Sequence, residues 1–138
     1  MLFVDLDDFK LINDARGHDV GDRCLCAAAT RLLDGVRAVD AVARFGGDEF
    51  LILIEDAATL PDVIEVARRV VRALTRPLTV AGLELQVGAS VGVATTASPR
   101  TAPESLVREA DLAMYQAKAR GGSRYAMFEA PPRRSAMH

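Results

Sequence analysis

The sequence predicts one α/β domain of the α+β type, built on a mixed central β-sheet with helices on one or both faces. The chain has 138 residues, half of them apolar and a quarter charged, which suits one globular domain with one core. Helix-spaced and strand-like apolar stretches alternate in the order β-α-α-β-β-α-β-β-α-β. A mid-chain hairpin makes the sheet mixed, because its two strands run antiparallel.

The first half of the chain is expected to hold a strand, two helices and the hairpin. The strand covers Met1–Asp5, and the first helix covers Asp8–Ala15, with Gly17 suited to end it. Asp19 can cap the second helix, which runs to about residue 33. The hairpin covers residues 39–54. The second helix is expected to bury Cys24, Ala27, Ala28 and Leu32.

A third helix and two strands follow. Thr59 is expected to cap the helix, and the strands cover Leu78–Val80 and Leu83–Thr95. The second strand contains Gly88 and Gly92, which indicate a bulge or a close approach of another backbone. The apolar stripe of the third helix is Val63, Ile64, Ala67, Val70, Val71 and Leu74.

The last helix and strand complete the domain. Thr101 and Glu104 have the spacing of a capping box, and Gly121-Gly122 ends the helix. The final strand covers Tyr125–Phe128, and residues 130–138 form a loose tail. The helix is expected to bury Leu106, Val107, Ala110, Ala113, Met114 and Ala117.

Composition excludes several classes of function. A net charge of −2 gives no basic field for nucleic acid or an anionic membrane. No apolar run has the length of a membrane span, and the start does not resemble a signal peptide. Cys24 and Cys26 have neither redox nor zinc spacing, so we expect small packing residues in a reducing compartment. These features predict a cytoplasmic domain.

The hairpin carries the most unusual pattern, Arg44-Phe45-Gly46-Gly47-Asp48-Glu49-Phe50. Adjacent glycines predict a two-residue turn with positive φ at its central positions. Strand alternation places Asp48 and Glu49 on opposite faces, so both can face one ion only if the turn is distorted. The alternative is an acidic hairpin tip that faces solvent.

Asp5 stands where the first strand ends, and Asp48 stands where the hairpin turns back. If the two strands are neighbours, these carboxylates meet at one edge of the sheet. Such oxygen ligands suit Mg²⁺, which binds one or two carboxylates together with substrate phosphates. The pair is typical of metal-assisted phosphoryl or nucleotidyl transfer. The alternative is two solvated acids at strand ends.

Two polar residues on the early helices have the chemistry to read guanine. Asp22 can accept from the N1–H and 2-amino groups of guanine, and Asn13 can bond N3 or N7. Lys10 and Lys118 can each meet a phosphate. The alternatives are a turn residue, a first-turn helix acid and two solvated lysines.

Together these stretches resemble the GGDEF family, the diguanylate cyclases. Gly46–Phe50 spells the family signature, preceded by the usual Arg44-Phe45. Phe3–Asp14, Gly17-His18 and Gly21-Asp22 match in order and spacing, and Ala113–Lys118 matches the final helix. The resemblance covers about residues 1–129, so we expect one GGDEF domain there and the tail at 130–138.

The resemblance implies a fold like the nucleotidyl cyclases and the polymerase palm. It implies that two GTP molecules are condensed into cyclic di-GMP, with loss of two pyrophosphates, between two domains that face each other. Asp5, the Leu6 carbonyl and Asp48 would bind Mg²⁺ or Mn²⁺. Asp48 would also draw the proton from the attacking 3′-hydroxyl, with Glu49 as a second acid. The residues implied at GTP are Asn13 and Asp22 at guanine, His18 at the base or ribose, Phe9, Lys10 and Lys118 near the phosphates, and Gly46 and Gly47.

Arg37-Ala38-Val39-Asp40 stands at the family's spacing for the RxxD inhibitory site, where the product binds and restrains the enzyme. A guanidinium can grip guanine or phosphate, and Asp40 can accept from the ring. The alternative is a surface Arg–Asp pair of little energetic weight.

The sequence departs from the family pattern in two places. The helix and the DxLTxLxNR-type stretch that normally precede the first strand are missing, and Gly122 stands where the family often has a triphosphate-binding arginine. We therefore expect a diguanylate cyclase homodimer with product inhibition, fused in its parent to sensory or EAL domains. The alternative is a weak or inactive module that binds GTP or cyclic di-GMP and regulates a neighbouring EAL-type domain.

Overall fold

The computed structural model of the chain describes residues 1–38, 40–55, 59–96 and 100–129. The element order matches the sequence prediction except that the long strand expected over Leu83–Thr95 is divided in two. The elements are β1 (Leu2–Leu6), α1 (Phe9–Arg16), α2 (His18–Gly35), β2 (Ala41–Arg44), β3 (Glu49–Leu53), α3 (Leu60–Thr75), β4 (Leu78–Val80), β5 (Leu83–Leu85), β6 (Ala89–Val93), α4 (Pro103–Ala119) and β7 (Arg124–Met127).

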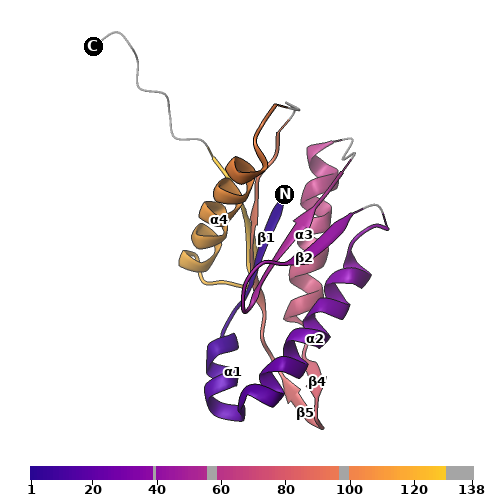
Figure 1. Cartoon of the computed structure of the whole chain (residues 1–138), viewed down its shortest axis with the longest axis vertical. Coiled ribbons are helices and arrows are strands. Elements are labelled where there is room, and N and C mark those ends of the chain that lie inside the picture. The colour runs from indigo at the N-terminus through magenta and orange to yellow at the C-terminus, as the bar shows by residue number, and fades with distance from the viewer. Residues whose placement is uncertain (39, 56–58, 97–99, 130–138) are drawn as a thin grey trace, which may run out of the picture.

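Five strands form one mixed sheet in the order β2-β3-β1-β6-β7, and β4 pairs with β5 in a separate hairpin (Figure 1). The central strand β1 runs antiparallel to both β3 and β6, whereas β7 runs parallel to β6. The prediction of a mixed sheet is therefore confirmed. In this register Asp5 lies opposite Glu49, so the end of β1 meets the hairpin motif directly.

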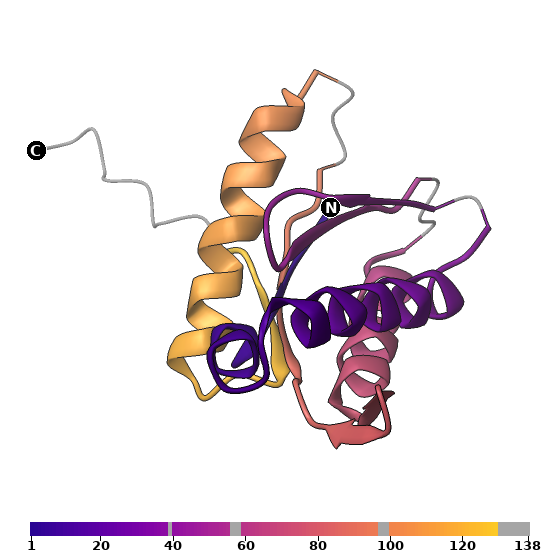
Figure 2. The ribbon, with the colours of Figure 1, turned by 60° about the horizontal axis from the view of Figure 1, so that its bottom comes forward.

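Helices cover both faces of the sheet, with α2 and α3 on one face and α4 on the other (Figure 2). Leu2, Val4 and Leu6 of β1 belong to the core cluster that contains the buried faces of α2 and α3. Phe3 packs instead in the smaller cluster with Ala110 and Met114 of α4. Because successive side chains of a strand point to opposite faces, Asp5 follows Phe3 to the α4 side.

The break between β5 and β6 lies at Gly88, whose φ of +74° is a conformation that glycine adopts readily. Gly92 marks a close backbone approach, since a Cβ there would lie 1.8 Å from the Ala110 carbonyl oxygen of α4. Gly92 therefore has the close backbone approach that its sequence context predicts, whereas Gly88 lies at a break between two strands rather than at a bulge within one.

The helix N-caps agree with the sequence in one case and differ in two. Thr59 caps α3 as predicted, accepting from the Asp62 amide. Gly17, not Asp19, is the N-cap of α2, and Asp19 lies in the first turn, where it complements the helix dipole. The capping box predicted for α4 is wrong, because Ala102 is the N-cap and the Thr101 hydroxyl pairs with that of Thr96 at 2.7 Å.

The structure also bears on the two cysteines and on membrane spans, but not on the tail. Cys24 is buried in the core as predicted, but Cys26 is exposed on α2 and does not pack. Among the residues that the structure describes, no helix combines the length and apolar character needed to cross a membrane. The tail predicted for residues 130–138 lies outside the described residues, as does Val39.

Candidate active site

The connection between β2 and β3 is a four-residue loop, Phe45 to Asp48, rather than the two-residue turn that the glycines predict. Neither Gly46 nor Gly47 has a positive φ. The Arg44 guanidinium donates to the carbonyls of both glycines, at 3.0 and 2.8 Å, and holds the wider loop in place. Glycine at position 46 leaves room for Glu49, whose Oε2 would lie 3.3 Å from an added Cβ.

This loop brings together the three predicted acids. Asp48 belongs to the loop, so strand alternation does not separate it from Glu49, the first residue of β3. One carboxylate oxygen from each of Asp5, Asp48 and Glu49 lies within 4.8 Å of the other two. The Leu6 amide donates to the Asp48 carbonyl at 3.1 Å and ties the loop to β1. The distortion required for both acids to face one ion is therefore present.

The electrostatics of this acidic cluster favour a bound cation. Burial and the negative charge of Asp48 raise the pKa of Asp5 to about 6, although Lys118 acts against the shift. Burial, then Asp48 and Asp111, also raise the pKa of Glu49. Asp5 Oδ1 is buried and has no hydrogen-bond partner in the part of the chain described, and its nearest cation is Lys118 Nζ at 3.5 Å.

The donor set fits Mg²⁺ or Mn²⁺. All three groups are carboxylates, which hard divalent cations prefer, and the buried oxygen of Asp5 is available to a ligand. No contact tests the predicted role of the Leu6 carbonyl, which remains a prediction.

Beside the acidic cluster lies an open hollow of about 340 Å³, the phosphate hollow, between the end of β1 and the loop after α4. Lys118 lines it, and its predicted role at a phosphate stays a prediction. Gly122 also lines it with a φ of +72°, and a Cβ there would lie 2.8 Å from Asp7 Oδ2. An arginine at position 122 would be strained in this loop. Arg124 Nε donates to the Gly122 carbonyl at 2.9 Å.

The predicted guanine residues lie on α1 and α2, which pack against each other. The two helices approach so closely that a Cβ on Gly21 would lie 1.8 Å from Asn13 Oδ1. This oxygen is buried without a hydrogen-bond partner among the described residues, while the neighbouring Asp22 is exposed. The Asn13 oxygen is therefore buried against α2, and the contact of its amide with N3 or N7 of guanine stays a prediction.

The remaining residues predicted to contact GTP include one that packs in the core and two that are exposed on the helices. The Phe9 side chain is 7% exposed and packs in the core, which leaves only its backbone for a ligand. Lys10 is exposed on α1, and His18 is exposed at the start of α2. No contact in the structure tests the predicted roles of these residues or of Gly47.

Arg37 and Asp40 form a closed pair at some distance along the chain from the acidic cluster. Asp40 accepts from the backbone amide, Nε and Nη2 of Arg37 at 2.9–3.2 Å, and Arg37 also donates to the Glu55 carbonyl. Burial acts to raise the pKa of Asp40, but the hydrogen bonds and charge of Arg37 outweigh it and hold the pKa below its ordinary value. The charge of Arg69 acts in the same direction, a contribution that sequence spacing did not suggest.

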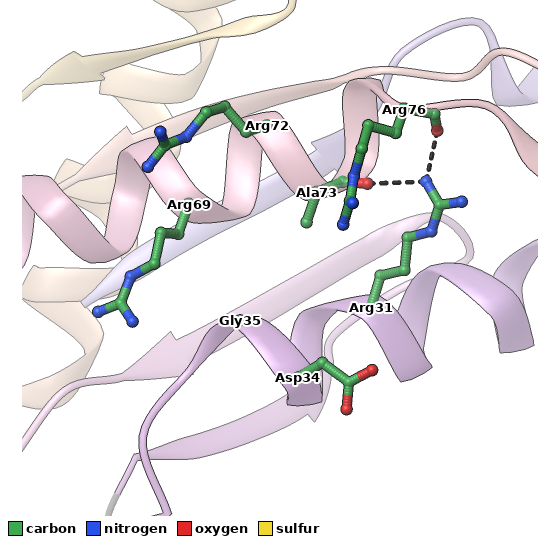
Figure 3. Close-up of a pocket in the computed structure, with 7 residues that line it drawn as sticks. All are labelled: Arg31, Asp34, Gly35, Arg69, Arg72, Ala73 and Arg76. Carbon is green, nitrogen blue, oxygen red and sulfur yellow. Dashed lines mark hydrogen bonds between the residues drawn. The ribbon is translucent and has the colours of Figure 1, made fainter.

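Arg69 also lines a groove of about 380 Å³ between α2 and α3 (Figure 3). Arg31 crosses this groove and donates to the carbonyls of Ala73 and Arg76 (Figure 3). It therefore fastens α2 to the end of α3. Arg69, Arg72 and Arg76 line the groove and make it a cationic surface, and of these Arg69 also acts electrostatically on Asp40.

The sequence interpretation missed Asp7 and Ser90. The Ser90 hydroxyl donates to Asp7 Oδ1 at 2.7 Å, and Lys118 Nζ lies 3.6 Å from the same oxygen. Asp7 follows Asp5 by two residues, so the acidic run after β1 was the available signal. The fully buried Ser90 gave no signal in the sequence, because its burial depends on the packing of distant segments.

A mixed sheet with flanking helices and its acids gathered at the hairpin is the palm-like fold of the nucleotidyl cyclases. The family model described as "Diguanylate cyclase, GGDEF domain" matches residues 1–124. The chain belongs to this GGDEF family.

Individual relatives agree with this assignment. The chain is 41% identical over 129 residues to the bifunctional diguanylate cyclase/cyclic di-GMP phosphodiesterase MucR of Pseudomonas aeruginosa, covering 94% of this chain and 19% of MucR. It is 46% identical over 123 residues to the response regulator PleD of Caulobacter vibrioides, covering 87% of this chain and 27% of PleD. The chain thus spans between a fifth and about a quarter of these relatives.

Solved structures share the fold. The GGDEF domain of PA1120 (YfiN or TpbB) from Pseudomonas aeruginosa superposes with a TM-score of 0.89 at 34% identity, covering 94% of this chain and 81% of that one. An EAL/GGDEF domain protein from M. capsulatus superposes with a TM-score of 0.87 at 41% identity, covering 94% of this chain and 83% of that one.

Proposed function

We propose that this chain is a diguanylate cyclase domain that joins two GTP molecules into cyclic di-GMP and releases two pyrophosphates. The observation that carries the proposal is the convergence of Asp5, Asp48 and Glu49 beside Lys118. Three acids with one nearby lysine leave an excess of negative charge, and a divalent cation relieves it. The domain would work in the cytoplasm, where the GTP pool lies.

The acidic cluster suits nucleotidyl transfer. Asp5, Asp48 and the Leu6 carbonyl would hold Mg²⁺ or Mn²⁺, which when bound stabilises negative charge on the reacting phosphate. Asp48 would accept the proton of the 3′-hydroxyl as its oxygen attacks the α-phosphorus and pyrophosphate leaves. Glu49 lies across from Asp5 in the β1–β3 register and would assist as a second acid.

The rest of the site would bind and orient GTP. Lys118 lines the phosphate hollow and would meet the triphosphate, with Lys10 and the backbone of Phe9 nearby. Asn13 and Asp22 would read guanine, since the Asn13 amide nitrogen can donate to N3 or N7 while the Asp22 carboxylate accepts from the N1–H and 2-amino groups. His18 would contact the base or ribose, and Gly46 and Gly47 would allow the nucleotide close to the loop.

One domain offers one such site, whereas the product requires two phosphodiester bonds. We therefore propose that two copies face each other, each holding one GTP, so that the 3′-hydroxyl of one nucleotide meets the α-phosphate of the other. Arg37 and Asp40 would bind the product and restrain this arrangement. Fusion to sensory or EAL-type domains is part of the proposal, because MucR combines both activities in its name and is several times longer.

A second candidate function is a regulatory module that binds GTP or cyclic di-GMP without turning it over. It is favoured by Gly122, where the family often has an arginine and where this loop leaves no room for one. Such a module would regulate a neighbouring EAL-type domain.

The deciding experiment is incubation of the protein with GTP and Mg²⁺ at a concentration high enough for dimers, with cyclic di-GMP measured by chromatography. We expect product from the wild type and none from Asp48→Ala. Nucleotide binding by calorimetry without any product would instead support the regulatory module. Absence of both binding and product would contradict the two functions together.

A further inference from the structure

Asp7 joins segments that are far apart in the sequence. Its Oδ1 accepts from the Ser90 hydroxyl of β6 at 2.7 Å, and its Oδ2 accepts from the Ser123 backbone amide at 2.8 Å. Lys118 Nζ, at the end of α4, lies 3.6 Å from Oδ1. Because both oxygens are already engaged, Asp7 is poorly placed to ligate a metal, unlike the acids of the neighbouring cluster.

The surroundings are shaped to hold this carboxylate. Ser90 is 0% exposed and is the one buried polar residue in the described part of the chain, so its hydroxyl needs the partner that Asp7 supplies. Gly122 and Gly88 both have positive φ. A Cβ at Gly122 would lie 2.8 Å from Asp7 Oδ2, and one at Gly88 would lie 2.6 Å from Ser123 Oγ.

We propose that Asp7 is a positioning residue that fastens Lys118 and the loop of residues 120–123 to the end of β1, and thereby shapes the phosphate hollow for the triphosphate of GTP. We call this set of contacts the Asp7 clasp. The part that concerns GTP rests on the proposed function, whereas the clasp itself rests only on the contacts above.

The clasp matters because Lys118 has two acidic neighbours, of which Asp5 would bind the cation and Asp7 would not. Its ammonium lies between Asp5, at 3.5 Å, and Asp7, at 3.6 Å. A cation bound at Asp5 takes up the charge that attracts Lys118 to that side, and Asp7 then keeps the lysine at the hollow. A lysine side chain is flexible, so an unanchored Lys118 would have to be ordered on binding and would bind phosphate more weakly.

The clasp also explains why an arginine is absent from position 122. The Ser123 amide reaches Asp7 only because the chain turns through left-handed conformations at residues 121–123. With these conformations the backbone of residues 121–123 lines the phosphate hollow, and position 122 contributes no side chain to it. Lys118 is therefore expected to carry a larger share of triphosphate binding than it would beside an arginine.

The test compares Asp7→Ala with the control Asp8→Asn, which removes the same charge from the adjacent residue. Asp8 has a φ of 57°, a conformation that asparagine tolerates, and its side chain makes no cap hydrogen bond. Two properties are measured on each protein. The first is the hydrogen exchange rate of the Ser123 amide, and the second is affinity for a non-hydrolysable GTP analogue and for GMP, with Mg²⁺ present.

We expect Asp7→Ala to accelerate exchange of the Ser123 amide at least about tenfold. Its affinity for the GTP analogue should fall by about tenfold, the size of one charge-assisted contact, whereas its affinity for GMP should fall less than twofold. Asp8→Asn should leave Ser123 exchange at the wild-type rate. It should bind the analogue at least as tightly as the wild type, because Asp8 also lines the phosphate hollow and the change removes a negative charge from that lining. Should Asp7→Ala fail to fold, Asp7→Asn provides the affinity comparison, because it keeps an oxygen for Ser123 but removes the charge that holds Lys118.

The outcomes separate the clasp from the proposed function. Unchanged Ser123 exchange in Asp7→Ala overturns the clasp, whatever the ligand results. Equal weakening of GMP and the GTP analogue overturns the positioning role and indicates general structural damage. If the wild type binds neither nucleotide, the proposed function fails together with the role at the triphosphate, and Ser123 exchange still decides whether the clasp exists.

Discussion

The acidic cluster and the Arg37–Asp40 pair shift the pKa values of their carboxylates in opposite directions. In the cluster, burial and repulsion raise the pKa of Asp5 to about 6, and its buried oxygen has no hydrogen bond within the described residues. In the pair, three hydrogen bonds from Arg37 more than offset burial and lower the pKa of Asp40. The charges of the acidic cluster therefore favour a bound cation. The Asp40 carboxylate is already hydrogen-bonded, so a ligand at the Arg37–Asp40 pair must compete with these bonds.

The largest expected effect is on catalysis at the cluster. Asp5→Asn should lower the rate of cyclic di-GMP formation by at least about a hundredfold, because it removes one ligand charge and one acceptor from the cation. Asp14→Asn, which removes an exposed acid of α1, is the matched control. Initial rates measured with GTP and Mg²⁺ test this. Similar losses in both variants would show that the cluster has no special role.

The next effect is on stability, and it should have opposite signs in the two regions. Asp40→Ala should lower the free energy of unfolding by about 2 kcal/mol, because the enclosed carboxylate accepts three hydrogen bonds. Asp48→Ala should leave the metal-free protein as stable as the wild type or more so, since it relieves repulsion on Asp5.

Urea unfolding without metal measures both variants. Glu65→Ala is the control, because it breaks the exposed Glu65–Arg72 pair, which should contribute less than about 0.5 kcal/mol. A loss in Asp40→Ala no larger than in this control would mean that the Arg37–Asp40 pair is an ordinary surface contact.

Much of this contrast was predictable from the sequence, but not its geometry. The acidic cluster and the RxxD pair depend on short motifs, and the structure brings the residues of each of these two sets together. The shape of the Gly46-Gly47 loop was not predictable, because the Arg44 side chain selects it. Asp7 and Ser90 were missed because their contact joins residues 83 positions apart.

A smaller effect is expected at the closed pair. Arg37→Ala should weaken cyclic di-GMP binding at least about tenfold, or 1.4 kcal/mol, because it removes a guanidinium fork from the ligand. Arg72→Ala, which removes an arginine of the α2–α3 groove that is paired with Glu65, is the control. Calorimetry with cyclic di-GMP measures both, and unchanged affinity in Arg37→Ala would refute the inhibitory site.

The smallest effect is on pH dependence. Asp5 has a folded pKa of about 6 against an ordinary value of 3.8, so its contribution to stability is full below about pH 4 and is lost as pH rises through 6. Asp40, with a lowered pKa, contributes in the opposite sense and loses its contribution only in acid below about pH 4.

Between pH 5 and 7, therefore, the metal-free wild type should lose about 1 kcal/mol relative to Asp5→Asn, less than the full linkage value because water reaches the site. Unfolding at several pH values measures the difference. A difference that stays constant from pH 5 to 7 would show that Asp5 titrates normally.

The most direct test is a calorimetric titration of Mn²⁺ into the protein saturated with a non-hydrolysable GTP analogue. The account predicts that Asp5→Asn binds Mn²⁺ at least about tenfold more weakly than the wild type, while Arg37→Ala binds it with wild-type affinity. Equal Mn²⁺ affinity in the wild type and Asp5→Asn would contradict the claim that the acids at the end of β1 and in the hairpin form a cation site.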